Sequence, residues 1–121
     1  MIYAVDFDGV LSHAPYPHVG NPNLELFDFL IKRRKHGDKV ILWTLREGEL
    51  LDLAVNFCKG WGLTFDAVND NLPEMIERWG CNSRKVSADV YLDDRAVNLT
   101  DFLKKYCNKR KGNVRSIRVR G

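Results

Sequence analysis

The chain has 121 residues, of which 45% are hydrophobic and 29% are charged, a composition that excludes a disordered chain. This length indicates one domain, and no apolar run approaches the about 18 residues of a membrane-spanning helix. The net charge of +3 is unevenly divided: residues 104–121 carry eight basic and no acidic side chains, whereas residues 1–103 carry 11 basic and 16 acidic ones. Three cysteines without metal-ligand spacing (Cys58, Cys81 and Cys107) are expected to be free thiols in a reducing compartment. We therefore expect a cytoplasmic protein with no membrane partner, an acidic body and a basic C-terminal end.

Short apolar segments alternate with segments of helical periodicity along the chain. The apolar segments predict β-strands at residues 2–7, 39–43, 65–68 and 88–92, with a fifth edge strand at 116–119. The intervening segments predict four helices, which begin at Asn21-Pro22, Glu47, Pro73 and Asn98. This alternation favours an α/β fold, a single-domain three-layer doubly wound (Rossmann-like) parallel sheet covered on both faces. We assign residues 1–108 to the catalytic domain and residues 109–121 to a basic tail or edge strand.

The two shorter helices each carry an apolar face. In the third helix we expect Met75, Ile76 and Trp79 to point inward. In the last helix the apolar residues at helical spacing are Leu99, Phe102, Leu103 and Tyr106. Ligands of doubly wound sheets bind at the carboxyl ends of the strands, so the chemistry is expected there.

Acidic residues follow the first and fourth predicted strands. A turn at Asp8-Gly9 lets the carboxylates of Asp6 and Asp8 reach one space, and Asp93 and Asp94 end the fourth strand. Carboxylates this close repel each other unless a cation or a shared proton compensates, and Mg²⁺ suits such oxygen ligands best. Strands distant in sequence lie side by side at a switch point, so three or four carboxylates would surround one ion. The alternative is that these acids form turns and cap the following helix.

Residues that suit a phosphoryl group lie at two further positions. The second predicted strand ends at Thr44, whose hydroxyl, together with the backbone N–H of Leu45, suits a phosphate oxygen. Arg46 is either a substrate contact or a solvated residue at the start of the second helix. Lys85 precedes the fourth strand and would bring positive charge to a phosphoryl group beside the carboxylates, although surface lysines are common without any function.

Together these positions resemble the four motifs of the haloacid dehalogenase superfamily. The stretch Asp6-Phe7-Asp8-Gly9-Val10-Leu11 is similar to the first motif, Thr44 to the second, Lys85 to the third and Asp93-Asp94 to the fourth. The motifs come in the superfamily's order over residues 2–106. The segments LWTLREGEL, FDAVNDNLPE and ADVYLDDRA further resemble its small capless hydrolases of phage and bacterial type. Lys85 lies only eight positions before Asp93, so Lys59 is the alternative lysine for the third motif.

The resemblance implies a Mg²⁺-dependent phosphatase, a phosphomonoester hydrolase that acts through an aspartyl-phosphate. Asp6 would attack phosphorus, and Asp8 would protonate the leaving oxygen and then deprotonate the hydrolytic water. Asp6, the backbone carbonyl of Asp8 and Asp93 would hold the Mg²⁺, with Asp94 bound through water or supporting the ligands. The substrate would be bound by four residues of the second and third motifs: Thr44, Leu45, Arg46 and Lys85.

The spacing of the motifs leaves no room for a cap domain. Caps in this superfamily are inserted between the first and second or the second and third motifs. Only 37 residues separate Asp6 from Thr44, and 40 separate Thr44 from Lys85. We therefore expect an open site, unless the loop 12–21 or another subunit covers it. That loop holds His13, Tyr16 and His18 and is expected to form a proline-stiffened aromatic flap beside the site.

Two other readings of the residues remain open. A response-regulator receiver domain also uses acids, threonine and lysine, but its phosphoacceptor lies on the third strand, which ends here at Val68-Asn69-Asp70. A second alternative is a phosphatase-like domain that processes or binds nucleic-acid ends through its basic tail, as opposed to a merely solvated tail. The phosphorylated substrate is thus either a small molecule or a polynucleotide end, and the oligomeric state stays open.

Overall fold

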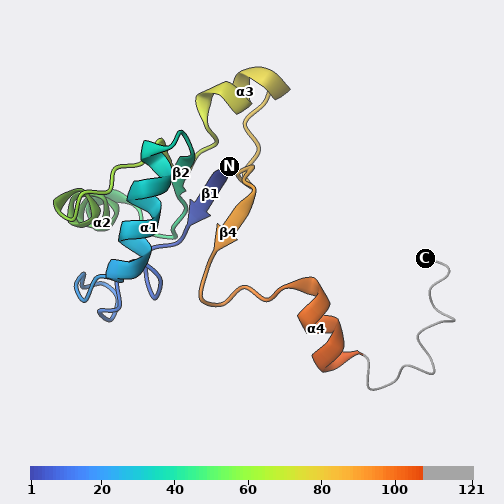
Figure 1. The fold of residues 1–121 in the computed structure, drawn as a ribbon, viewed down its shortest axis with the longest axis horizontal. Coiled ribbons are helices and arrows are strands. Elements are labelled where there is room, and N and C mark those ends of the chain that lie inside the picture. Colours follow the sequence, from blue (N-terminus) through green and yellow to red (C-terminus); the bar gives the residue numbers. More distant parts are fainter. Residues whose placement is uncertain (108–121) are drawn as a thin grey trace, which may run out of the picture.

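The computed structural model describes residues 1–107, in which four strands form one parallel sheet (Figure 1). The strands are β1 (Ile2–Val5), β2 (Lys39–Leu42), β3 (Ala67–Val68) and β4 (Val90–Leu92), and they lie in the order β3-β2-β1-β4. Val5 pairs with Leu42 on one side and with Leu92 on the other, so β1, β2 and β4 end level with one another. The predicted α/β fold with a parallel sheet is confirmed, and each strand is one or two residues shorter than its predicted segment.

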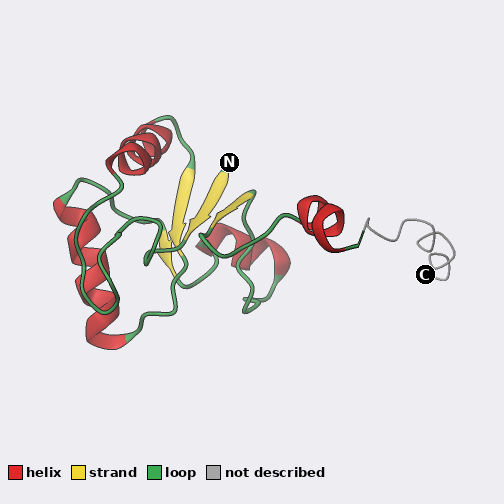
Figure 2. Cartoon of the chain, turned by 90° about the horizontal axis from the view of Figure 1, so that it is seen from below, coloured by secondary structure: helices red, strands yellow, loops and turns green. Residues whose placement is uncertain are grey.

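Helices cover both faces of the sheet (Figure 2). α1 (Leu24–Lys35) and α2 (Gly48–Gly60) pack on one face, where their apolar side chains join Tyr3 and Val5 in the main core. α3 (Pro73–Trp79) lies on the other face, where Met75 packs against a smaller core that contains Ala4. Successive side chains of a strand point to opposite faces, which explains why β1 contributes to both cores. The result is the predicted three-layer arrangement, consistent with a Rossmann-like fold.

The apolar face of α3 is only partly buried, and that of α4 (Leu99–Tyr106) is exposed. Trp79, which we expected to point inward, is 66% exposed, and α3 has no buried residue, so that prediction is wrong. α4 begins as predicted, since the Asn98 side chain accepts a hydrogen bond of 2.9 Å from the backbone N–H of Thr100. The helix stands apart from the sheet in Figure 1, and its large apolar residues are exposed: Leu99, Phe102, Leu103 and Tyr106. Helical periodicity predicts which side chains share a face, but it does not supply the surface that covers them.

Three sequence predictions concern residues outside the described part of the chain: the strand at 116–119, the tail 109–121 and the boundary at residue 108. Within residues 1–107, no helix combines the length and the apolar character that crossing a membrane requires.

Candidate functional site

The candidate site lies where β1 and β4 end side by side. The chain runs from β1 to β2 on one side of β1, and it returns to the other side with β4, which makes this the switch point of the sheet. The backbone N–H of Asp6 donates a hydrogen bond of 3.0 Å to the carbonyl of Leu92, which continues the pairing beyond β1. Asp6 is thereby held beside the residues that follow β4.

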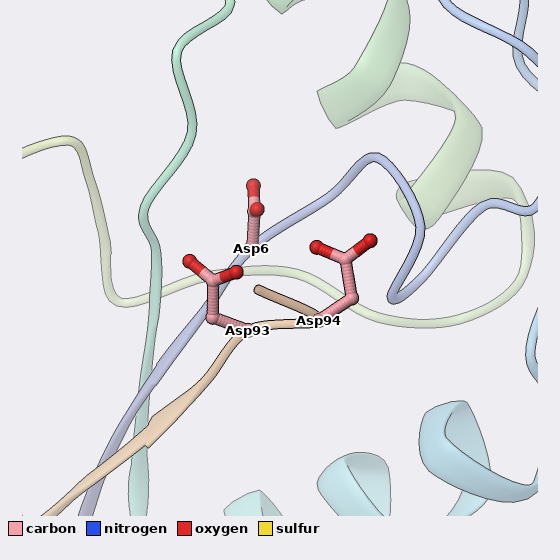
Figure 3. Close-up of side chains that lie close together, drawn as sticks. All are labelled: Asp6, Asp93 and Asp94. Atoms are coloured by element: carbon pink, nitrogen blue, oxygen red, sulfur yellow. The ribbon is translucent and has the colours of Figure 1, made fainter. Parts of the chain in front are cut away.

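Three carboxylates meet at this edge of the sheet, from Asp6, Asp93 and Asp94 (Figure 3). Each offers one oxygen, and these oxygens lie within 4.8 Å of one another. Burial raises the pKa of Asp6 to about 6, and the negative charges of Asp93, Asp8 and Asp94 act in the same direction. Magnesium takes oxygen ligands at about 2.1 Å, so ligands on opposite sides of the ion are about 4 Å apart. The donor set therefore fits a magnesium ion, which would draw the three oxygens slightly closer together than the 4.8 Å limit.

A tight turn after β1 carries Asp8 and Gly9 past this cluster. The carbonyl of Phe7 accepts a hydrogen bond of 2.9 Å from the backbone N–H of Leu11, which closes the turn. Gly9 has a φ of +80°, and a Cβ added to it would collide with the carboxylate of Asp94. Position 9 therefore requires glycine for two reasons, the left-handed backbone and the close approach of Asp94.

Asp8 does not join the three carboxylates and pairs with Arg46 instead. Nε of Arg46 donates to Oδ2 of Asp8 and Nη2 donates to Oδ1, both at 2.8 Å. The residue Arg46 is only 2% exposed, whereas the Asp8 side chain keeps 29% of its surface accessible. The carboxylate of Asp8 is thus not placed as a metal ligand, and the predicted ligation through its backbone carbonyl remains a prediction.

Arg46 also joins two other parts of the chain to this pair. Nη1 donates to the carbonyl of Leu50 in α2 at 3.2 Å, and Nη2 donates to the carbonyl of His18 in the 12–21 loop at 3.1 Å. The guanidinium lies 4.9 Å from the ring centroid of Phe7 and 5.1 Å from that of Tyr16. A solvated position at the start of the helix is therefore wrong for Arg46, and its role as a substrate contact remains a prediction.

The loop after β2 is braced by Asn69, a residue that the sequence analysis missed as a site residue. Asn69 accepts a hydrogen bond of 2.7 Å from the backbone N–H of Thr44, and it donates one of 3.4 Å to the carbonyl of Arg46. The Thr44 hydroxyl accepts a 3.1 Å hydrogen bond from the backbone N–H of Arg46, which leaves its own proton to be donated. Leu45 between them is fully exposed. The sequence offered one signal for this role, an asparagine directly after a predicted strand. Asparagine tolerates a positive φ, and Asn69 has a φ of +53°.

A pocket of about 830 Å³ connects these groups. Its lining brings together most of the predicted site residues: Asp6, Asp8, Gly9, His13, Ala14, Pro15, Tyr16, Trp43, Thr44, Leu45, Arg46, Asp93, Asp94 and Arg95. Arg95 was missed by the sequence analysis, although it directly follows the second acidic pair.

Neither candidate lysine lines this pocket. Lys59 is exposed on α2, and the ammonium of Lys85 lies 5.6 Å from the ring centroid of Tyr91. Lys85 belongs to the segment that leads into β4, whereas the acids follow the strand. In a parallel sheet these are opposite ends, which explains why a short spacing before Asp93 does not bring the lysine to the carboxylates.

No protein-family model matches the chain, and no curated protein matches it. Among solved structures, the chain is similar to a conserved protein from Bacteroides thetaiotaomicron, with 38% sequence identity and a TM-score of 0.70. The match covers 93% of this chain and 91% of that chain. Identity at this level, over nearly the full length of both chains and with a shared fold, shows that the chain belongs to the family of this conserved Bacteroides thetaiotaomicron protein.

Proposed function

We propose that this protein is a Mg²⁺-dependent phosphatase of the haloacid dehalogenase superfamily, a phosphomonoester hydrolase that acts through an aspartyl-phosphate. The observation that carries the proposal is the meeting of Asp6, Asp93 and Asp94 at the switch point, in one pocket with Thr44. A carboxylate cluster, a hydroxyl donor and cationic side chains around one pocket are the groups that phosphoryl transfer requires.

Asp6, Asp93 and Asp94 would hold the magnesium ion, with the backbone carbonyl of Asp8 as a further ligand. When bound, the ion withdraws charge from the phosphoryl oxygens and reduces their repulsion of an attacking carboxylate. The raised pKa of Asp6 supports this role, because a carboxylate that is partly buried and lies beside other acids gains from a cation.

Asp6 acts as the nucleophile and Asp8 moves the proton. An oxygen of Asp6 forms a bond to phosphorus, the bond from phosphorus to the leaving oxygen breaks, and that oxygen takes a proton from Asp8. Water then attacks the phosphorus of the aspartyl-phosphate and gives a proton back to Asp8. The bond between Asp6 and phosphorus breaks, phosphate leaves, and both side chains return to their starting states.

In the structure both carboxylate oxygens of Asp8 accept hydrogen bonds from Arg46. Asp8 must carry a proton in the first step, so at least one of the two hydrogen bonds from Arg46 has to be released when substrate binds. Arg46 thereby acts on the chemistry by positioning Asp8.

The phosphoryl oxygens would be bound by the Thr44 hydroxyl and the backbone N–H of Leu45. Positive charge inside the pocket comes from Arg46 and Arg95, and Arg95 is better placed than Lys85 for contact with substrate. Lys85 would reach the phosphoryl group only after a movement of the segment before β4.

The proposed site is open and has no cap. Between Asp6 and Thr44 the chain forms the 12–21 loop, α1 and β2, and between Thr44 and Lys85 it forms α2, β3 and α3. Each of these helices and strands belongs to the sheet or its covering layers. The 12–21 loop, which lines the pocket through residues 13–16, is then the part of the described chain that borders the substrate.

The test is the initial rate of p-nitrophenyl phosphate hydrolysis with Mg²⁺, for the wild type and for two matched variants. Asp6→Asn removes the nucleophile and is expected to reduce the rate to that of the uncatalysed reaction. Asp52→Asn removes an exposed acid of α2 that does not line the pocket, and it is expected to keep the wild-type rate. Chelation by EDTA should abolish the activity and added Mg²⁺ should restore it. Undiminished activity of Asp6→Asn, or of the wild type in EDTA, contradicts the proposal.

A further inference from the structure

The pocket is much larger than the group that the three carboxylates and Thr44 would bind. Its volume of about 830 Å³ lies within the range of about 300–1,000 Å³ that is typical of sites for whole small molecules. The acids occupy one end, formed by the residues after β1 and β4. The remaining wall comes from residues 13–16 of the 12–21 loop and from Trp43, which directly follows β2. That part of the pocket faces the leaving group of a substrate rather than its phosphate.

Tyr16 supplies an aromatic surface on this wall. The residue is 60% exposed, and its ring centroid lies 5.1 Å from the guanidinium of Arg46. Arg46 is itself fixed by Asp8 and by the carbonyl of His18, so the ring packs on a cation that does not move freely. A preorganised, exposed ring of this kind loses little conformational freedom when a ligand stacks on it.

Trp43 supplies a second aromatic surface beside Thr44. It directly follows β2, where its backbone N–H donates a hydrogen bond of 2.9 Å to the carbonyl of Val5. Its indole packs against the ring of Tyr91 in β4, with centroids 5.4 Å apart. Both neighbours are strands of the sheet, so the indole is held on a rigid element while it lines the pocket.

We propose that this pocket takes phosphomonoesters whose leaving group carries a flat aromatic ring, and that the ring stacks on Tyr16 or Trp43. The ligand class is a nucleoside monophosphate, either free or as the phosphorylated end of a single strand. The inference rests on the proposed function, because the phosphate of the ligand is placed at the three carboxylates and Thr44.

The composition of the wall favours a base over a carbohydrate. Apart from the acids, Gly9 and residues 44–46, the pocket presents Ala14, Pro15, Tyr16 and Trp43. His13 and Arg95 are the side chains in this part that can donate hydrogen bonds. The hydroxyl groups of a sugar lose their hydration on entering such a wall and find few partners. A base loses little hydration from its faces, and stacking on one aromatic side chain tightens binding by about fivefold or more.

The experiment compares the binding of adenosine 5′-monophosphate and ribose 5-phosphate, which carries a hydroxyl group at C1 in place of the base. Binding is measured by titration calorimetry with Mg²⁺ on the full-length Asp6→Asn protein, which cannot consume the ligand. We expect the nucleotide to bind at least about fivefold more tightly. The same ratio is then measured after the further changes Tyr16→Leu and Tyr16→Phe. The ratio should fall with leucine and be kept with phenylalanine, because phenylalanine retains the ring.

Equal affinities for the two ligands overturn the inference, as does a ratio that survives both Tyr16→Leu and the corresponding Trp43→Leu. A 5′-phosphorylated adenosine trinucleotide distinguishes a free nucleotide from a strand end as the ligand. Tighter binding of the trinucleotide than of the mononucleotide indicates that the pocket takes a strand end. Failure of the proposed function gives a different result. If the wild type hydrolyses none of these compounds and the base-dependent ratio is nevertheless found, the proposed phosphatase activity is wrong and the proposed nucleotide site is supported.

Discussion

Arg46 and Asp8, 38 positions apart in the sequence, are joined by two hydrogen bonds of 2.8 Å that fix the plane of the carboxylate. The same guanidinium donates to the carbonyl of His18 in the 12–21 loop. One side chain therefore sets both the orientation of the proposed proton carrier and the position of the loop that borders the pocket.

Arg46→Lys tests this arrangement, because lysine keeps the charge and loses the paired donors. We expect the free energy of unfolding in urea to fall by up to about 3 kcal/mol, the lower end for breaking a buried pair, since Asp8 stays partly exposed. For hydrolysis of p-nitrophenyl phosphate, kcat should fall more than KM changes, because the proposed mechanism uses Asp8 in both chemical steps. Arg33→Lys is the matched control, since Arg33 also pairs with an aspartate, Asp38, but its side chain is 41% exposed and the pair is expected to contribute less to stability. Equal effects of the two changes would contradict the positioning role.

Gly9→Ala tests the close approach between the turn after β1 and Asp94. The added Cβ would meet the Asp94 carboxylate, so we expect weaker Mg²⁺ binding in a calorimetric titration. Gly37→Ala is the control, because Gly37 also has a positive φ, of +100°, but nothing lies within 4 Å of the added Cβ. Both variants should lose about 1–2 kcal/mol of stability from backbone strain. If both variants bind Mg²⁺ with the same affinity, the close approach of Gly9 and Asp94 does not matter for metal binding.

The raised pKa of Asp6 predicts how the stability of the metal-free protein depends on pH. The carboxyl binds its proton more tightly in the folded state, with a pKa of about 6 against 3.8 for the ordinary value. Its contribution to stability is therefore fully present below about pH 3.8 and is lost as the pH rises through about 6. We expect the difference in Tm between Asp6→Asn and the wild type to grow over this range in EDTA and to shrink with Mg²⁺. A difference that does not change with pH would contradict the burial of this carboxyl.

Asn69→Gly tests the brace behind the loop after β2. Glycine adopts the φ of +53° without strain, so in the folded state the change removes the two side-chain hydrogen bonds to Thr44 and Arg46 and adds no backbone strain. We expect a loss of about 1 kcal/mol in the free energy of unfolding and a raised KM for p-nitrophenyl phosphate, because Thr44 would bind the phosphoryl group. A loss of stability without any change in KM would separate Asn69 from substrate binding.

The sequence predicted the parts of the structure that depend on local pattern. Apolar runs located all four strands of residues 1–107, and Asn98 was identified as the cap of α4. The grouping of Asp6 with Asp93 and Asp94 followed from one topological rule, because the carboxyl ends of neighbouring parallel strands share an edge. That this group binds Mg²⁺ stays a prediction.

What the sequence missed depends on tertiary contacts between side chains. The pairing of Asp8 with Arg46 needs the segment between β2 and α2 to approach the turn after β1, which no local pattern encodes. Lys85 was expected at the site from its order in the chain, yet it lies before the strand that the acids follow. Trp79 matches helical spacing but has no surface to cover it, so periodicity alone gave the wrong burial.

β4 lies at one edge of the sheet and is joined to β1 by three residue pairs. Two of the three clustered acids, Asp93 and Asp94, follow this short strand, so they leave Asp6 together whenever β4 detaches. An ion held by all three acids would bind only while β4 is paired with β1. Its binding would therefore stabilise the pairing of the two strands. Binding of such an ion and attachment of β4 to β1 would in this way stabilise each other.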